Sequence, residues 1–502
     1  MNNRAFTLIG SLLVLGAGSA AAQVQPPSMP QTLSLDDALE LAERYNPTYR
    51  QTANDRAPAA WAVRNAYSSF LPTFSVSSSG TYRGAGTQRF LTTEFTQPSA
   101  TIGSSYSLTL NWNFNGNTLL QPGVTKAALS ASDASVDAMR LNVRSTIVQQ
   151  YVGILEGKAQ VALQERQVER NLENLRLAQA RFDVGQATMI DVRQAEVAKG
   201  QSDVALLQAH QNVTVETLRL YQQMGVPAPE DLSTVTLSDT FPVVAPNWSL
   251  EDLLIEADAN NPNVNAMRAR ETSAEWSERA VKSRWLPSIS IFAGWSGFTQ
   301  QFTNGDFLVP QAQGQLASNL TACNIQNTIH QDINSRGANL PVLACDQFFT
   351  FTPAIEAAIL DGQRAFPFNF NNNPFVAQLT ISLPIFDQFD RNLRISQASA
   401  AAEDAQEFRR ALELQTRTDV SQQYYALSTA YESIAIQDNN RTAAQDAMRL
   451  ARARYRVGSG TFFELLDAQL ANEQAEADYI TASFNYHRSL VSLEAAVGRT
   501  LR

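Results

Sequence analysis

Two cysteines and three histidines are the side chains whose chemistry in this chain depends most on spacing. Cys323 and Cys345 lie in one segment, where they could form a disulfide or remain two free thiols. His210, His330 and His487 are scattered and lack the spacing of metal ligands. No nucleophile paired with a base, no phosphate-binding loop and no metal cluster is recognisable. The sequence therefore predicts neither an enzyme nor a bound metal or cofactor.

The N-terminus predicts export from the cytoplasm. Arg4 precedes an apolar run at Ala5–Ala17, and the alanines at 20–22 form an A-x-A cleavage site. We interpret residues 1–22 as a signal peptide; the alternative is an N-terminal helix of the mature fold. Export implies an oxidising compartment, which favours the disulfide over free thiols. The formal net charge of −10 argues against nucleic acid as a partner.

No later segment has the roughly 20 consecutive apolar residues of a transmembrane helix. If the chain spans a membrane, it must therefore do so with strands, because only helices and closed barrels satisfy all backbone groups in lipid.

The chain repeats itself. SLDDALELAERYNP at Ser34–Pro47 returns as SLEDLLIEADANNP at Ser249–Pro262. RFDVGQATMIDVRQA at Arg181–Ala195 returns as RYRVGSGTFFELLDA at Arg454–Ala468, an offset of 273 residues (454 − 181). Repeats of this size are whole architectural units. We predict a first repeat at residues 23–225, a Pro-rich linker at 226–248 and a second repeat at 249–502, with a large insertion at about 297–374.

Each repeat has the same predicted order of elements. A helix begins at Ser34, is interrupted at Asn46-Pro47 and ends before Leu71-Pro72. Two strands of period 2 follow, joined by a polar loop rich in Gly, Thr and Ser. The apolar positions of the predicted strands are Phe74, Val76, Tyr82, Tyr106, Leu108, Leu110, Trp112 and Phe114, then Ile289, Ile291, Ala293, Trp295, Phe375, Ala377, Leu379, Ile381 and Leu383.

A very long helix then follows in each repeat, at about Thr125–Phe182 and Asn392–Tyr455, and neither predicted stretch contains a proline. A glycine, Gly185 or Gly458, suits the left-handed position that ends a helix. A partner helix of about 38 residues leads back to Gly225 or Gly498, by comparison of the two repeats. Each half is therefore predicted to carry a long helical hairpin.

Four strands per chain cannot close a barrel, and an open sheet would leave two edges unpaired in a membrane. Closure needs at least about eight strands, so strands have to be shared between chains. The predicted molecule is a homo-oligomeric tube with a strand part and a helix part, and the residues alone leave its copy number open.

With these motifs in place, the chain resembles the TolC-type outer-membrane efflux protein (outer-membrane factor) family. The resemblance rests on the paired motifs quoted above, on Leu71-Pro72 and Leu286-Pro287, and on LTISLPIFDQ at Leu379–Gln388. It implies an α+β membrane protein, a homotrimer whose 12-stranded outer-membrane β-barrel is continuous with a long periplasmic α-helical barrel. It further implies a passive exit duct of a tripartite efflux pump or type I secretion system.

The resemblance also implies partners. The hairpin ends, with Gly185, Thr188, Gly458 and Thr461, would meet a periplasmic adaptor, and the adaptor would join the duct to an inner-membrane pump of RND, ABC or MFS type. The barrel would contact outer-membrane lipid. The cargo is not readable from the sequence.

The family's pore constriction falls on Glu464 and Asp467. Their spacing of three places both carboxylates on one helix face, and threefold symmetry would stack two rings of negative charge that favour cations. The alternative is a pair of ordinary solvated acids at a helix N-terminus, favoured by its dipole.

The family's closed state is latched by an Asp, a Tyr and an Arg. Asp191 and Tyr455 match the first two, whereas Gly460 stands in place of the arginine. The latch is either weaker here or completed by Arg456 or Arg193.

The inserted segment is too long for an ordinary loop and predicts structure of its own. Its phenylalanines could pack as a lid over the barrel mouth, or the segment could be a surface loop that covers its own core. The insertion also supports an alternative function, a structural or adhesive envelope protein with a helical periplasmic spacer and a surface ligand loop.

Overall fold

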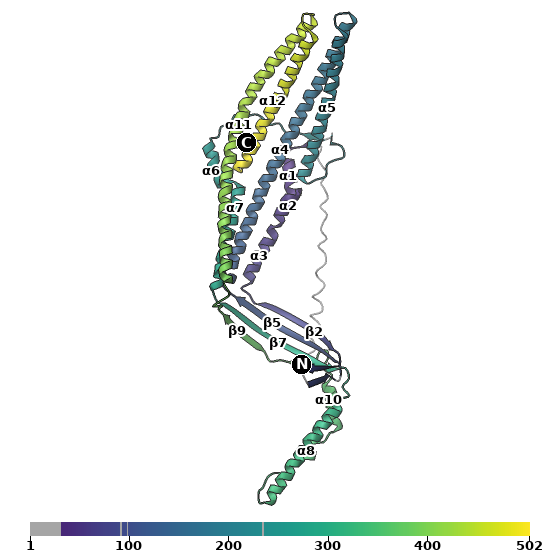
Figure 1. Cartoon of the computed structure of the whole chain (residues 1–502), viewed down its shortest axis with the longest axis vertical. Coiled ribbons are helices and arrows are strands. Elements are labelled where there is room, and N and C mark those ends of the chain that lie inside the picture. Colours follow the sequence, from purple (N-terminus) through teal and green to yellow (C-terminus); the bar gives the residue numbers. More distant parts are fainter. Residues whose placement is uncertain (1–31, 91–92, 98, 233–234, 502) are drawn as a thin grey trace. The chain divides into compact units, whose positions relative to one another are not determined.

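The computed structural model describes residues 32–90, 93–97, 99–232 and 235–501, and the chain divides into two compact units. The helical unit comprises Met1–Ala62, Thr125–Trp276 and Ser399–Arg502, and the sheet unit comprises Val63–Val124 and Ser277–Ala398. Figure 1 shows the helices and strands of both units. The predicted signal peptide, residues 1–22, lies outside the described residues. Within them, no helix combines the length and apolar character that a membrane span requires.

The first helices begin where the capping residues predict. In α1 (Leu35–Tyr45), the Ser34 hydroxyl accepts a bond from the Asp37 N–H at 3.1 Å, and the Asp37 carboxylate accepts one from the Ser34 N–H at 3.1 Å. These bonds form a capping box and hold the pKa of Asp37 below its usual value. α2 (Pro47–Asn54) starts at Asn46, whose side chain accepts from the Tyr49 N–H at 2.9 Å. The predicted interruption at Asn46-Pro47 is confirmed.

The remaining helices of the helical unit are partly shared with the sheet unit. Their bounds are α3 (Arg56–Ser68), α4 (Gly116–Asp183), α5 (Met189–Met224), α6 (Leu250–Asn260), α7 (Pro262–Lys282), α11 (Asp390–Arg456) and α12 (Phe462–Val497).

Two predicted boundaries were wrong. The insertion, expected from about residue 297, begins only after a strand that ends at Phe302. The first long helix, expected from about Thr125, begins at Gly116 and contains Pro122. The Asn115 side chain accepts a bond from the Thr118 N–H at 3.0 Å and so caps the earlier start. Pro122 lies in the second turn, where its missing N–H removes a single helical hydrogen bond near the end rather than in the interior. The extra turns thus tolerate the proline.

The C-terminal ends of α5 and α12 make equivalent contacts, with the segment before α2 and the segment before α7 respectively. Gly225 (φ +78°) and Gly498 (φ +97°) both adopt the left-handed conformation, and a Cβ on either would overlap the backbone before α2 or α7. The side-chain amide of Asn46 donates to a carbonyl near the end of α5 at 2.6 Å, and that of Asn261 donates to one near the end of α12 at 2.7 Å. The shared glycine and asparagine contacts explain why both sequence copies carry these residues.

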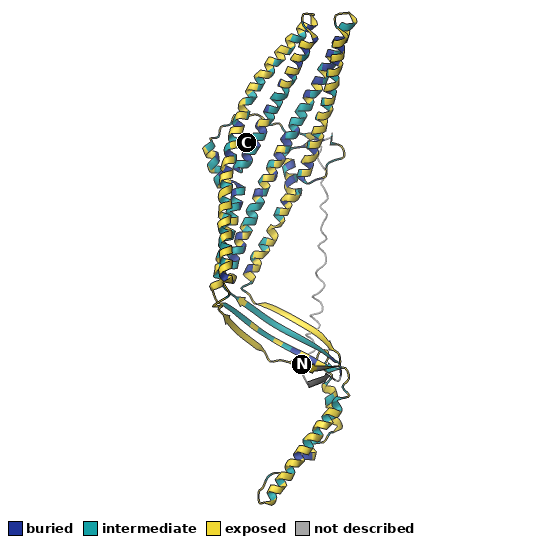
Figure 2. Ribbon diagram, viewed as in Figure 1, coloured by how far each residue is buried: buried dark blue, intermediate teal, exposed yellow. Residues whose placement is uncertain are grey.

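The core of the helical unit runs along seams between helices, as the burial colours in Figure 2 show. Tyr151 and Tyr221 are almost fully buried in one cluster, and Leu427 and Tyr486 in another. The Tyr151 hydroxyl donates to the Asp239 carboxylate at 2.7 Å, and burial raises its pKa. A short parallel pair of strands, β1 (Thr32–Leu33) with β6 (Thr236–Leu237), packs against the cluster that contains Tyr151 and Tyr221.

The sheet unit contains four long antiparallel strands in the order β2, β5, β7, β9. Their bounds are β2 (Thr73–Arg83), β5 (Thr101–Phe114), β7 (Ser288–Phe302) and β9 (Val376–Ser382), and a short strand β8 (Asn371–Asn372) pairs with the far end of β7. β2 and β9 are the edge strands, and both are exposed along their whole length (Figure 2).

The sheet has one face that carries the predicted apolar positions, as the period of 2 predicts, and an opposite face that is mainly polar but includes Phe292, Phe298 and Phe302 of β7. The register places Leu110 opposite Ala293, and Ala293 opposite Ala377, so that the predicted apolar positions share a face. On the other face, paired hydroxyls form a ladder across β2 and β5 with O···O distances of 2.6–2.8 Å. The ladder pairs are Ser75 with Thr109, Ser77 with Ser107 and Ser79 with Ser105. Each face therefore suits a different solvent.

The loop predicted between the first two strands is not merely a loop. It contains a separate antiparallel hairpin, β3 (Gly86–Phe90) and β4 (Thr93–Gln97). Strands this short carry too few residues to display a clear alternating pattern, which is why the sequence indicated only a polar connection.

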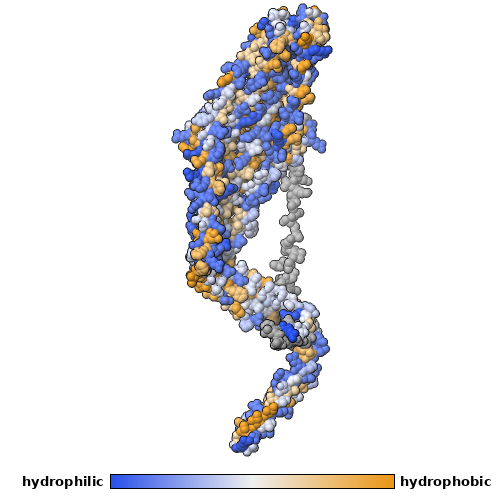
Figure 3. All heavy atoms as spheres, in the orientation of Figure 1, coloured by the Kyte–Doolittle hydropathy of each residue, from blue (hydrophilic) through white to orange (hydrophobic). Residues whose placement is uncertain are grey.

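The insertion does form structure of its own. It contains α8 (Leu308–Ser335), α9 (Cys345–Phe349) and α10 (Pro353–Gly362), and Cys323 of α8 is disulfide-bonded to Cys345. Asn327 forms a reciprocal pair with Leu343, donating to its carbonyl at 2.7 Å and accepting from its N–H at 2.8 Å. Figure 3 shows apolar atoms at the surface of this segment, where Ile325, Ile329, Val342 and Phe348 are exposed. Within α8–α10 only the two cysteines are buried, so this segment does not cover a core of its own.

The phenylalanines of the insertion do not gather into one cluster. Phe370 packs on Tyr106 of β5, with ring centroids 4.8 Å apart, whereas Phe348 is exposed on α9.

Candidate functional site

The ends of the two long hairpins carry most of the predicted site residues, and both turns are built in the same way. After α4, Gly185 (φ +76°) donates its N–H to the Phe182 carbonyl at 2.9 Å. After α11, Gly458 (φ +81°) donates to the Tyr455 carbonyl at 3.1 Å. Both glycines adopt the left-handed conformation that ends a helix, as predicted.

The threonines of the turns are helix caps. Thr188 and Asp191 form a capping box at the start of α5, in which the Asp191 carboxylate accepts from the Thr188 N–H at 2.8 Å. Thr461 caps α12 and accepts from the Glu464 N–H at 3.2 Å. The Asp191 carboxylate is therefore occupied by hydrogen bonds that cap the N-terminus of α5.

The two predicted constriction acids are exposed on the first turns of α12. The Glu464 carboxylate lies 3.8 Å from an Arg454 guanidinium nitrogen, with both side chains about half exposed. A pair so exposed contributes little energy. Asp467 is likewise exposed. In a single chain, the carboxylates of Glu464 and Asp467 are thus exposed and could lie near those of other copies of the chain in an oligomer.

Among the predicted latch residues, no hydrogen bond or ion pair joins Tyr455 to Asp191, Arg193 or Arg456 in the described part of the chain, although the Asp191 charge acts on Tyr455. Tyr455 is only 3% exposed, and its hydroxyl has no hydrogen-bond partner among the described residues. Burial raises the pKa of Tyr455. The positive charge of Arg181 lowers this pKa, and the negative charge of Asp191 raises it. Arg193 instead pairs with Glu196 at 2.7 Å. Arg456 is exposed.

The arginine that reaches Tyr455 is Arg181, which the sequence analysis did not single out. Its guanidinium carbon lies 4.4 Å from the centre of the Tyr455 ring, and it also donates to the Tyr455 carbonyl. A second bond reaches the Gln186 carbonyl within its own turn at 3.4 Å. Arg181 thereby ties the first hairpin end to the second. The signal was present, because Arg181 opens the repeated RF/RY motif and its counterpart Arg454 makes the equivalent turn contact, to the Ser459 carbonyl at 3.4 Å.

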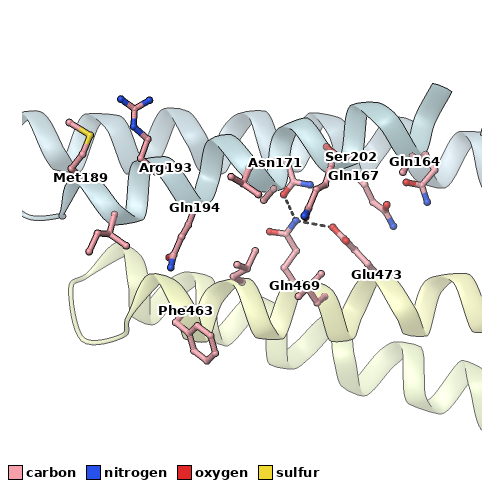
Figure 4. Close-up of a pocket in the computed structure, with 17 residues that line it drawn as sticks. Gln164, Gln167, Asn171, Met189, Arg193, Gln194, Ser202, Phe463, Gln469 and Glu473 are labelled. Carbon is pink, nitrogen blue, oxygen red and sulfur yellow. Dashed lines mark hydrogen bonds between the residues drawn. The ribbon is translucent and has the colours of Figure 1, made fainter. Parts of the chain in front are cut away.

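A buried seam of amides joins α4 to α12 next to these turns. Gln469 of α12 donates to the Asn171 side chain at 2.6 Å and accepts from that of Asn174 at 2.5 Å. Gln469 also donates to the Glu473 carboxylate at 2.8 Å, and burial raises the pKa of that carboxyl. Figure 4 shows Gln469 pointing from α12 toward Asn171. The amide contacts join the two helices by hydrogen bonds, and the partly buried Glu473 carboxyl belongs to the same seam.

This seam was not predicted from the sequence. Gln167, Asn171 and Asn174 step by four and three along α4, which is the spacing of a helix contact stripe, but polar residues at that spacing look like a solvated face.

An open groove of about 620 Å³ lies beside the seam, between α4, α5 and α12 (Figure 4). Its walls are mainly apolar and include Met189, Ile190, Val197, Phe463 and Leu470. All five of these side chains are about half exposed or more in a single chain. An apolar wall of this kind, next to a hairpin end, is a surface suited to another protein chain.

The amide seam makes a prediction about stability. In Gln469→Leu, Asn171 and Asn174 lose their partner while remaining buried, and each unsatisfied amide costs about 1–3 kcal/mol. We expect the melting temperature of the purified protein in detergent, followed by circular dichroism at 222 nm, to fall measurably.

The control is Gln474→Leu on the same helix, because the Gln474 side chain is exposed and bonds only across one turn to Asp478. An equal fall in both variants would show that the seam contributes nothing particular to stability.

Comparison with known proteins agrees with this geometry. A family model described as "Outer membrane efflux protein" matches residues 38–226 and 353–499. The outer membrane efflux protein BepC of Brucella suis biovar 1 is 26% identical over 176 residues, which are 34% of this chain and 37% of that protein. The chain thus matches little more than a third of the length of this curated relative.

Solved structures share the fold over nearly the whole chain. The outer membrane protein VceC of Vibrio cholerae matches with a TM-score of 0.66 and 15% identity, covering 93% of this chain and 97% of that one. The CmeC outer membrane channel of Campylobacter jejuni matches with a TM-score of 0.68 and 15% identity, covering 92% and 85%. At such identity the likeness concerns the fold alone.

Proposed function

The chain belongs to the outer membrane efflux protein family, and we propose that it forms the exit duct of a tripartite efflux pump or type I secretion system. The protein resides in the outer membrane and extends into the periplasm. In this proposal the duct conducts its cargo passively and has no enzymatic activity. The observation that carries the proposal is a two-faced sheet with both edges unpaired, joined to two helical hairpins with exposed contact stripes.

The sheet supports a barrel made from several copies. Its edge strands β2 and β9 have no partner beyond the sheet among the described residues, although unpaired strand edges are unfavourable in lipid. Three copies would supply 12 strands, four per chain, with apolar side chains toward outer-membrane lipid and the hydroxyl ladder toward the lumen. The polar face would then line a water-filled pore.

The helices support a ring by the same logic. Within one chain, α12 of the second hairpin packs on α4 of the first through the amide seam. At an offset of 273 residues, α5 corresponds to α12, and α11 corresponds to α4. On α5, Ile190, Val197 and Val204 recur every seven residues and are all more than half exposed. We infer that α5 of one copy packs on α11 of the next, which closes an α-helical barrel in a homotrimer.

The presence of two similar helical hairpins supports the two repeats proposed from the sequence, at residues 23–225 and 249–502 with a linker at 226–248. Their ends, with Gly185, Thr188, Gly458 and Thr461, are the proposed contacts of a periplasmic adaptor. Through the adaptor, the duct would serve an inner-membrane pump of RND, ABC or MFS type.

The gate is proposed at the same ends. Rings of Glu464 and Asp467 from three copies would constrict the pore. The contact of Arg181 with Tyr455 would hold the two hairpin ends together in the closed state, in place of an arrangement with Arg193 or Arg456. Asp191 contributes through its helix cap and through its charge near Tyr455.

A crosslinking experiment tests the proposed assembly. The contact of Asn171 with Gln469 within one chain corresponds, at the offset of 273 residues, to Ala444 of one copy and Glu196 of the next. We expect the double variant Glu196→Cys/Ala444→Cys, treated with a short bismaleimide, to yield covalent dimers and trimers on denaturing gels.

Each single variant is the control, because neither carries both halves of the pair and the two native cysteines are bonded to each other. A double variant that stays monomeric, or forms a ladder beyond the trimer, would overturn the proposed ring. A crosslink within one chain would leave the mass unchanged and is therefore distinguishable.

A further inference from the structure

The insertion returns to the sheet through residues 365–372, here called the return segment. Besides the pairing of β8 with β7, three hydrogen bonds that involve side chains hold it on β5 and β7. The Phe366 N–H donates to the Gln301 side chain at 3.2 Å, and the Ser104 hydroxyl donates to the Pro367 carbonyl at 2.5 Å. The Tyr106 hydroxyl donates to the side-chain oxygen of Asn372 at 2.7 Å. The segment is thus docked on the sheet rather than hanging from it.

The return segment lies on the apolar face of the sheet. Ser104 and Tyr106 have the same parity along β5 as Leu108 and Leu110, and successive side chains of a strand alternate between faces. Gly297 lies opposite Tyr106 on β7. A Cβ on Gly297 would come within 2.5 Å of the Tyr106 ring, so the glycine leaves room for this tyrosine beneath the segment.

Aromatic side chains collect where the segment crosses the face. Phe370 meets Tyr106 edge-on at 4.8 Å, and Phe375 packs on Trp295 at 4.6 Å. Phe368 is 74% exposed and Phe366 is 42% exposed. Phe366 and Pro367 bond to Gln301 and Ser104, which lie near the strand ends remote from α4. Tyr106 and Trp295 lie in the middle of β5 and β7, where the apolar positions that continue toward α4 begin. Aromatic residues at the end of an apolar strand face are typical of a membrane–water interface.

We propose that the return segment lies at the outer-leaflet interface of the outer membrane and contacts lipid acyl chains through Phe366 and Phe368. This inference rests on the proposed function, in which the apolar face of the sheet meets lipid. The end of the segment, β8, lies beside β7 at the same edge as β9, where copies would join. A second copy is nevertheless the poorer occupant at Phe366 and Phe368, because Phe366 and Pro367 bond to side chains of the central strands β7 and β5. The insertion is thereby anchored outside the pore at its return point, rather than closing over the lumen.

A spin label at position 368 tests the proposal in the full-length protein. The chain has two cysteines, and they are bonded to each other, so Phe368→Cys introduces the one free thiol for a nitroxide. The labelled protein is reconstituted in vesicles of phosphatidylcholine and phosphatidylglycerol. Relaxation by oxygen, which concentrates in acyl chains, is compared with relaxation by a water-soluble nickel chelate.

Two matched labels calibrate the result. Leu379→Cys lies on the apolar face of β9, where Leu379 is 62% exposed. Arg336→Cys lies at the end of α8, where the side chain is 75% exposed and polar. We expect the ratio of oxygen to nickel accessibility at position 368 to approach that at position 379 and to exceed that at position 336 several-fold.

The three labels together distinguish failure of the further inference from failure of the proposed function. If position 379 is in lipid but position 368 behaves like position 336, the return segment is in water and the inference is overturned while the proposed function stands. If position 379 is also in water, the sheet does not face lipid, and the proposed function fails together with the inference.

Discussion

Replacing Arg181 with methionine is expected to open the duct. Met retains much of the aliphatic stem but removes the guanidinium that stacks on Tyr455 and donates to its carbonyl. A cation–π contact contributes about 0.5–2 kcal/mol, and a hydrogen bond from a charged group about 1.5–3 kcal/mol. Because each 1.4 kcal/mol is about a tenfold change in an equilibrium, we expect the ratio of open to closed channels in planar bilayers to rise by roughly tenfold or more.

Tyr455→Phe distinguishes this contact from a latch through the tyrosine hydroxyl. The hydroxyl has no hydrogen-bond partner among the described residues, whereas the ring is what Arg181 covers. Phenylalanine keeps the ring, so we expect conductance close to that of the unmodified protein. An open channel in Tyr455→Phe with a closed one in Arg181→Met would reverse our assignment.

Arg449→Met is the matched control for the loss of a positive charge. Arg449 is 81% exposed and pairs only within its own helix, with Asp446 at 3.0 Å. Its replacement should leave the conductance unchanged.

Removing the two acids at the start of α12 is expected to change ion block as well as conductance. In the proposed trimer, Glu464 and Asp467 form two rings of three carboxylates in a narrow pore. The double variant Glu464→Ala/Asp467→Ala removes both charge and volume. We expect higher single-channel conductance and at least about a tenfold weaker block by Ca²⁺, which corresponds to about 1.4 kcal/mol of lost binding free energy.

The isosteric variant Glu464→Gln/Asp467→Asn separates charge from size. It should weaken Ca²⁺ block while leaving the width of the constriction, and hence the steric limit on conductance, nearly unchanged. The control Glu407→Ala/Asp446→Ala also removes two exposed acids, both from α11. Block that persists in both constriction variants would exclude the acids as the cation site.

Local features of the fold were predictable because they depend on backbone geometry within a few residues. Ser34 caps a helix, and Gly185 and Gly458 end helices in the left-handed conformation, as their residue types require. The alternation of the strands placed Leu108, Ala293 and Leu379 correctly on one face. The start at Gly116 and the hairpin at Gly86–Gln97 escaped prediction, because neither a proline near a helix end nor a very short strand has a decisive local pattern.

The sequence by itself thus determined the period of each helix and strand, the residues that cap the helices, and the correspondence between the two halves of the chain. Only the tertiary structure decided that Arg181 meets Tyr455, that Gln469 lies between Asn171 and Asn174, and that the return segment crosses the apolar face. These contacts join residues hundreds of positions apart, so they depend on the register in which whole elements dock. No local spacing encodes that register, because polar amides and a lone arginine follow the same helical period whether they face water or a neighbouring helix.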